Sequence, residues 1–303
     1  MRGLGRPTLR TSMAVALLVC GGLLAPAAAA TDIAKPAAGA AIAARDRGLI
    51  ASRLREMPPP VAGQPDLYAL AFAGDGDEHV FRNEALYFEQ LATVRYGAAG
   101  RALALVNHPD SLDDADPRPL ATVENLALAL AGIGKLMDPQ EDLLLLFVTS
   151  HGSPGHALTV YLDGHVDTVL RPEALRAALD ASGIRHRLLI VSSCYSGGFI
   201  PGLATPDTLL ITAARHDRPS FGCGDTGSAT WFGHALLVEG LNRDGGLVAA
   251  FEYAKRQVEW REATEDVDPS HPQISIGADL PARLQAWEAA LVPGPPLPYP
   301  HPH

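Results

Sequence analysis

Between residues 65 and 292 the chain alternates between short runs of apolar residues and longer stretches of mixed apolar and polar positions. The apolar runs predict six strands, at 67–73, 101–107, 143–149, 188–192, 208–213 and 273–276. The mixed stretches predict helices at 83–96, 120–137, 172–181, 230–241 and 247–262, and residues 158–170 predict a small hairpin. Uninterrupted apolar strands that alternate with helices are typical of a mostly parallel sheet covered on both faces. The sequence therefore predicts an α/β domain, residues 65–292, with a mostly parallel six-stranded sheet.

Candidate chemistry follows two of the predicted strands. Strand 143–149 leads into His151 and Gly152, and strand 188–192 leads into Cys194. Right-handed crossovers place the carboxyl ends of parallel strands along one edge of the sheet, and neighbouring strands lie about 4.8 Å apart. His151 and Cys194 are therefore expected to meet at the edge where α/β proteins place their sites.

A nucleophilic thiol needs an acid/base group to manage protons and donors to hold an oxyanion. His151 fits the first role, and the backbone N–H groups of Gly152 and Cys194 fit the second, since a glycine lets substrate approach the main chain closely. Each residue alone has a simpler interpretation: a cysteine after an apolar strand is often a small buried hydrophobic residue. A histidine beside a glycine is often a loop residue. The occurrence of both His151 and Cys194 at the carboxyl ends of consecutive core strands, however, favours catalysis.

Composition excludes several other classes of function. The 303 residues carry a formal charge of −10 and no run of basic residues, so nucleic-acid phosphates are not an expected partner. Three cysteines are too few for a disulfide scaffold, and no CxxC pair or HExxH motif suggests zinc. The composition therefore gives no indication of a zinc site.

The two ends of the chain differ from the central domain. Residues 1–30 combine early arginines, a short apolar run and an Ala-rich end, the pattern of a cleaved secretory signal peptide. An uncleaved membrane anchor and lipidation at Cys20 are alternatives, and the expected location is periplasmic or extracellular. Residues 31–64 predict an Ala/Pro-rich tether with one helix at 42–56, and residues 293–303 form a Pro-rich tail.

The motifs at the predicted edge resemble those of a known family. The sequence LLLLFVTSHG, followed 43 residues after the histidine by RLLIVSSCYSGG, resembles the legumain-type cysteine peptidases, including their bacterial secreted members. The resemblance implies a caspase-like three-layer α/β/α fold and a cysteine endopeptidase that acts on peptide or protein substrates. It also implies a catalytic dyad of His151 and Cys194 without metal or cofactor.

The resemblance is weaker at the substrate-binding positions. Arg82 matches the family's arginine, but Asn83 stands where a histidine is expected, Ser192 replaces a glutamate and Thr230 falls near an expected aspartate. Arg82, Ser192 and Thr230 are therefore the predicted substrate-binding residues. Without its acidic partners, Arg82 is expected to favour an acidic residue at P1, the substrate residue before the cleaved bond.

Alternatives remain open for both the function and one cysteine. The same dyad suits a transpeptidase or transamidase, in which an amine instead of water releases the acyl-enzyme. The other alternative is a catalytically silent, envelope-bound binding module. Cys223 either lines the cleft as a free thiol or forms a disulfide with Cys194, which would silence the nucleophile.

Overall fold

The structure is a computed structural model that describes residues 34–224 and 227–301. The chain divides into two compact units, Met1–Ala38 and Gly39–His303, and the second contains the whole sheet. The predicted signal peptide and Cys20 lie outside the described residues. Within the described ranges, no helix is both long enough and apolar enough to cross a membrane.

A six-stranded sheet with the strand order β2-β1-β3-β6-β7-β8 forms the centre of the second unit. Its strands are β1 (Leu67–Ala73), β2 (Ala102–Val106), β3 (Leu143–Thr149), β6 (His186–Ser192), β7 (Thr208–Thr212) and β8 (Gln273–Ile276). The first five run parallel and are buried along their length, whereas β8 is antiparallel to β7. The predicted mostly parallel sheet is confirmed.

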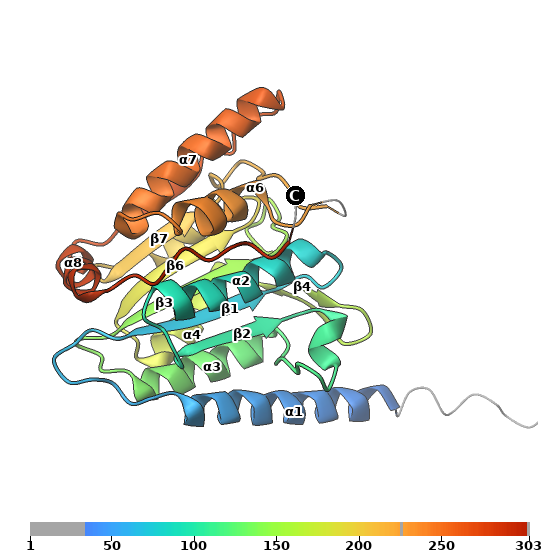
Figure 1. The fold of residues 1–303 in the computed structure, drawn as a ribbon. Coiled ribbons are helices and arrows are strands. Elements are labelled where there is room, and N and C mark those ends of the chain that lie inside the picture. The colour runs from blue at the N-terminus through green and yellow to red at the C-terminus, as the bar shows by residue number, and fades with distance from the viewer. Residues whose placement is uncertain (1–33, 225–226, 302–303) are drawn as a thin grey trace, which may run out of the picture. The chain divides into compact units, whose positions relative to one another are not determined.

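Helices cover both faces of the sheet (Figure 1). One face packs against α2 (His79–Arg95), α7 (Gly246–Thr264) and α8 (Leu280–Ala290), and the other against α3 (Val123–Leu136), α4 (Pro172–Ser182) and the part of α1 (Ala34–Glu56) in this unit. The two faces follow from the period of two along a strand, since Tyr68 and Phe72 of β1 face one core and Ala69 and Ala71 the other. The fold is a three-layer α/β/α arrangement, as predicted.

Three short elements complete the chain. The hairpin strands β4 (Leu158–Leu162) and β5 (Val166–Leu170) pair antiparallel, as predicted. Helix α5 (Ile200–Leu203) follows a 3₁₀ turn after β6. The predicted helix at 230–241 is a short α6 (Trp231–Gly233) that continues as a π-helix, His234–Gly240.

Two segments differ from the sequence prediction. From Gly39 onward, α1 packs against the domain: Ile50 is fully buried, and the buried carboxylate of Asp46 accepts hydrogen bonds from Leu120 N (3.0 Å) and Asn125 Nδ2 (2.8 Å). Residues of the predicted tether are therefore part of the folded unit, because the helix contributes apolar surface to the core. The pattern analysis also missed α8, which buries Leu280, Leu284 and Trp287.

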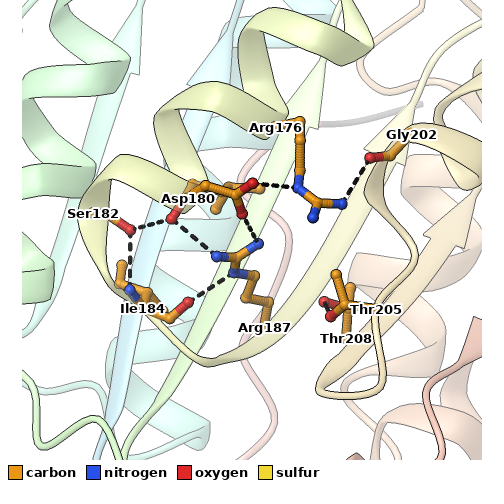
Figure 2. A network of polar contacts seen from close by, with 9 residues as sticks. Arg176, Asp180, Ser182, Ile184, Arg187, Gly202, Thr205 and Thr208 are labelled. Carbon is orange, nitrogen blue, oxygen red and sulfur yellow. Dashed lines mark hydrogen bonds and ion pairs between the residues drawn. The ribbon is translucent and has the colours of Figure 1, made fainter.

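The amino end of β6 is held by a network of polar contacts (Figure 2). Arg187 donates to Ile184 O (2.8 Å) and Leu179 O (3.0 Å) and forms an ion pair with Asp180 (3.0 Å). These contacts join α4 to the strand that follows it.

Candidate active site

The two predicted catalytic residues lie at the same edge of the sheet because β3 and β6 are direct neighbours. Thr149 pairs with Ser192 in register, and His151 and Cys194 each stand two residues further along. A Cβ added at Gly152 would lie 2.0 Å from Cys194 O, so the two loops are in close contact and only glycine fits there. The structure therefore brings the loops that carry His151 and Cys194 together.

The thiol of Cys194 is partly exposed and lies against the loop that follows β7. Its Sγ is 3.3 Å from both Ser220 N and Ser220 O. The thiol donates to Ser220 O, and its sulfur accepts a hydrogen bond from the Ser220 N–H, so this loop fixes the position of the sulfur. The next residue, Tyr195, has φ +57° and donates its N–H to Arg218 O (2.8 Å). This left-handed residue turns the chain sharply away after the cysteine.

His151 contacts an acidic residue from the loop after β1. Its Nε2 lies 3.1 Å from Glu78 Oε1, and the Phe81 ring packs edge-on against the imidazole at 5.0 Å. The other oxygen, Glu78 Oε2, is buried and makes no hydrogen bond to any described residue. Sequence reasoning missed Glu78, although its place just after a parallel strand was a usable signal.

Two backbone N–H groups at this edge are unused. Gly152 forms an antiparallel β-bridge with Leu158. The bonds of this bridge come from the neighbouring residues: Thr159 N donates to His151 O (2.9 Å), and Ser153 N donates to Ala157 O (3.0 Å). In this pattern the N–H of Gly152 itself points away from Leu158. Within residues 34–224 and 227–301, neither Gly152 N nor Cys194 N donates to a protein acceptor. These are the two groups that the sequence predicts as oxyanion donors.

Ser192 and Thr230 lie close together but are buried below the edge, with their side-chain oxygens 3.4 Å apart. They meet a carboxylate that the sequence did not predict. Glu84 Oε1 accepts hydrogen bonds from Thr230 N (2.8 Å) and Thr230 Oγ1 (2.7 Å), and its Oε2 accepts one from Thr149 Oγ1 (2.6 Å). Burial raises the pKa of Glu84 above its usual range. Helix α2 thus places a carboxylate in the core beside Ser192 and Thr230.

Arg82 is not left without a carboxylate, which corrects the sequence expectation. Its Nη2 lies 2.8 Å from Asp110 Oδ2, in a pair whose side chains are 27% and 54% exposed. The described residues show no polar contact between Arg82 and the buried Ser192–Thr230 pair. The neighbouring Asn83 instead donates to Ser228 O at 3.2 Å.

Cys223 lies near Cys194 as a free thiol, and Cys194 is also free, so no disulfide joins them. Burial, together with nearby Cys194 and Glu78, raises the pKa of Cys223 to about 11. At neutral pH Cys223 is therefore a poor nucleophile. Among the residues that the structure describes, no group of three or more His, Cys, Asp or Glu side chains could hold a metal ion.

Comparisons with known proteins agree with this geometry. The model of the Peptidase C13 family matches residues 124–281, just over half of the chain, and that segment contains His151 and Cys194. No curated protein matches the sequence significantly.

Among solved structures, the chain is similar to caspase-1 from Spodoptera frugiperda, with 16% identity, a TM-score of 0.49, and 73% of this chain and 93% of that chain covered. It is also similar to pro-sf-caspase-1, with 15% identity, a TM-score of 0.47, and 70% and 92% covered.

Proposed function

The chain belongs to the Peptidase C13 family and is a cysteine peptidase, and we propose on this premise that it is an endopeptidase with Cys194 as nucleophile and His151 as acid/base. One observation carries the assignment of the residues. The paired strands β3 and β6 end in register, so that the loops bearing His151 and Cys194 pack against each other at Gly152. The unused N–H groups of Gly152 and Cys194 support the same assignment.

The proposed reaction runs in two steps. The Cys194 thiol gives its proton to His151, and the sulfur attacks the carbonyl carbon of the substrate peptide bond. The N–H groups of Gly152 and Cys194 hold the oxyanion that forms. His151 then protonates the leaving amine as the C–N bond breaks, which leaves an acyl group on sulfur. Water, losing its proton to His151, attacks this thioester and releases the acid and the free thiol.

Glu78 is the proposed third member of the site. Its carboxylate accepts a hydrogen bond from the His151 Nε2–H, which holds the ring orientation and leaves Nδ1 for proton exchange with substrate and thiol. A carboxylate also stabilises the imidazolium that forms during the reaction.

The test is peptide cleavage by purified chain starting at residue 31. Cys194→Ala should abolish cleavage with little change in melting temperature, while Cys223→Ala should retain it. His151→Ala should lower turnover by about 10²–10⁴-fold, and His165→Ala, on the exposed hairpin turn, should have no effect. Full activity in Cys194→Ala would contradict the assignment.

Product mass spectrometry with an added amine separates hydrolysis from the alternative chemistry. Hydrolysis gives only the free acid, whereas a transpeptidase gives the amide adduct as the main product. Absence of both products with folded protein would favour a binding module.

We also propose that the protein is exported. The support is the N-terminal pattern of residues 1–30 alone. Intact-mass measurement of the chain from cell fractions tests this: cleavage after Ala30 is expected, and an acylated N-terminus at Cys20 would instead show a lipid tether.

A further inference from the structure

The Pro-rich tail after α8 is packed along α2 rather than free (Figure 1). A Cβ added at Gly294 would lie 1.9 Å from Val94 O, and Arg95 Nη1 donates to Gly294 O at 2.7 Å. Further along, Leu297 N donates to Asn242 Oδ1 (2.8 Å), and Leu297 O accepts from the Tyr87 hydroxyl (2.7 Å). These main-chain contacts guide the tail toward the edge of the sheet that carries the active site.

Near its end the tail reaches Ser228, in the segment that precedes α6. The Tyr299 hydroxyl donates to Ser228 O at 2.6 Å, and Asn83 Nδ2 donates to the same oxygen at 3.2 Å. The Tyr299 ring packs edge-on against Tyr87, with centroids 4.9 Å apart. Burial raises the pKa of Tyr299 far above its usual range, so the hydroxyl stays a donor at physiological pH.

Ser228 belongs to the segment Gly227–Thr230, which connects to the nucleophile through short contacts. Thr230 is fixed by Glu84, and the next residue, Trp231, donates its N–H to Phe221 O at 3.0 Å. Phe221 follows Ser220, whose N–H lies 3.3 Å from Cys194 Sγ. The position of Ser228 is therefore coupled to the loop that contacts the thiol.

We propose that Tyr299 is a positioning residue for peptide substrates: through Ser228 it holds Gly227–Thr230 in its binding position, which makes the C-terminal tail part of the active site. This inference rests on the proposed peptidase function. A purely structural tail would instead affect only the stability of the fold.

The first experiment compares Tyr299→Phe with Tyr253→Phe, which removes a hydroxyl of α7 that donates to Glu239 Oε2 at 2.9 Å. Both variants are assayed with peptide substrate well below their melting temperatures. Tyr299→Phe should raise KM about fivefold to tenfold with little change in kcat, and Tyr253→Phe should leave both constants unchanged. An unchanged KM in Tyr299→Phe, whatever its melting temperature, would overturn the proposal.

A second pair of variants separates the effect of Tyr299 from the effect of the residues that follow it. Chains ending after Pro298 and after Tyr299 both lose His301, but only the first loses the tyrosine. The shorter chain should have the higher KM, and equal KM values would also overturn the inference. Iodoacetamide labelling of Cys194 should be similar in all variants. If the wild-type chain shows no Cys194-dependent cleavage, the proposed function itself fails, which is a distinct result.

Discussion

Asp142 and Arg187 at the amino edge of the central sheet are bonded differently from Glu78 and Gly152 at its carboxyl edge. At the amino edge, Asp142 accepts backbone hydrogen bonds from Asp66 N (2.9 Å) and Asp138 N (2.7 Å), and Arg187 is bound to two carbonyls and a carboxylate (Figure 2). At the carboxyl edge, Glu78 Oε2 is buried without a partner among the described residues, and the N–H of Gly152 has no acceptor there.

This difference separates stability from function along the same strands. A buried polar group without a partner costs stability, so such groups persist where they serve another purpose. The groups at the amino edge are bonded mainly to the main chain and fix the connections between elements. At the carboxyl edge, the proposed role of the Gly152 N–H is to bond the substrate, and the proposed role of Glu78 is to hold His151.

The largest effect is expected from adding one methyl group at each edge. A Cβ at Gly152 would lie 2.0 Å from Cys194 O, and a Cβ at Gly134 would lie 2.1 Å from Ser182 O, between α3 and α4. Gly152→Ala should lower kcat/KM by at least about 100-fold, because it displaces both oxyanion donors. Gly134→Ala should lower the melting temperature while the activity per folded molecule stays normal. Equal loss of activity in both variants would remove the contrast.

A smaller effect is expected from Glu78→Gln, which removes the charge facing His151. Losing a charge-assisted hydrogen bond should lower kcat roughly 10–100-fold. Asp207→Asn is the matched control, since Asp207 Oδ1 faces His186 Nδ1 at 3.4 Å at the amino end of β6. Steady-state kinetics of the two variants should differ clearly, and wild-type turnover in Glu78→Gln would exclude it from the mechanism.

Two buried carboxylates at opposite ends of β3 should respond differently to amide substitution. In Glu84→Gln, the Thr149 hydroxyl can rotate and accept a hydrogen bond from the new amide N–H. Both donors to Asp142 are backbone N–H groups, which cannot accept a hydrogen bond from the amide of an asparagine. Asp142→Asn should therefore destabilise the fold by about 1–3 kcal/mol, and Glu84→Gln by much less. Urea unfolding of both variants measures this difference, and equal destabilisation would contradict it.

The pH dependence of stability gives a second test of the buried carboxylate of Glu84. Burial raises the pKa of Glu84, so the folded state binds the proton more tightly than the unfolded state. Its contribution to stability is complete below the unfolded pKa and is lost as the pH rises through the folded pKa. As the pH rises from about 4 to neutral, the free energy of unfolding of Glu84→Gln should therefore increase relative to that of the wild type. A constant difference across that range would show that Glu84 does not titrate with unfolding.

The smallest effect concerns P1 specificity. The half-exposed pair of Arg82 and Asp110 is worth at most about 1 kcal/mol, so an acidic P1 side chain competes with Asp110 for the arginine. Asp110→Ala should raise cleavage after acidic residues about twofold to fivefold in a P1 scan at neutral pH. An unchanged scan would show that Arg82 does not face the P1 side chain.

The sequence by itself determined the sheet and the place of the candidate dyad. Continuous apolar runs specify buried parallel strands, and the carboxyl ends of such strands share one edge. These rules place His151 and Cys194 at one edge without any knowledge of distant contacts. They do not specify which side chains from other segments reach that edge.

Only the tertiary structure shows which side chains from other segments lie at the carboxyl edge of the sheet. Glu78 is 73 residues from His151 along the chain, Glu84 is 146 residues from Thr230, and Tyr299 is 71 residues from Ser228. No local periodicity encodes such pairs, because they depend on how α2, the loop after β7 and the tail pack together. The sequence thus predicted where chemistry would occur, and packing decided which residues surround it.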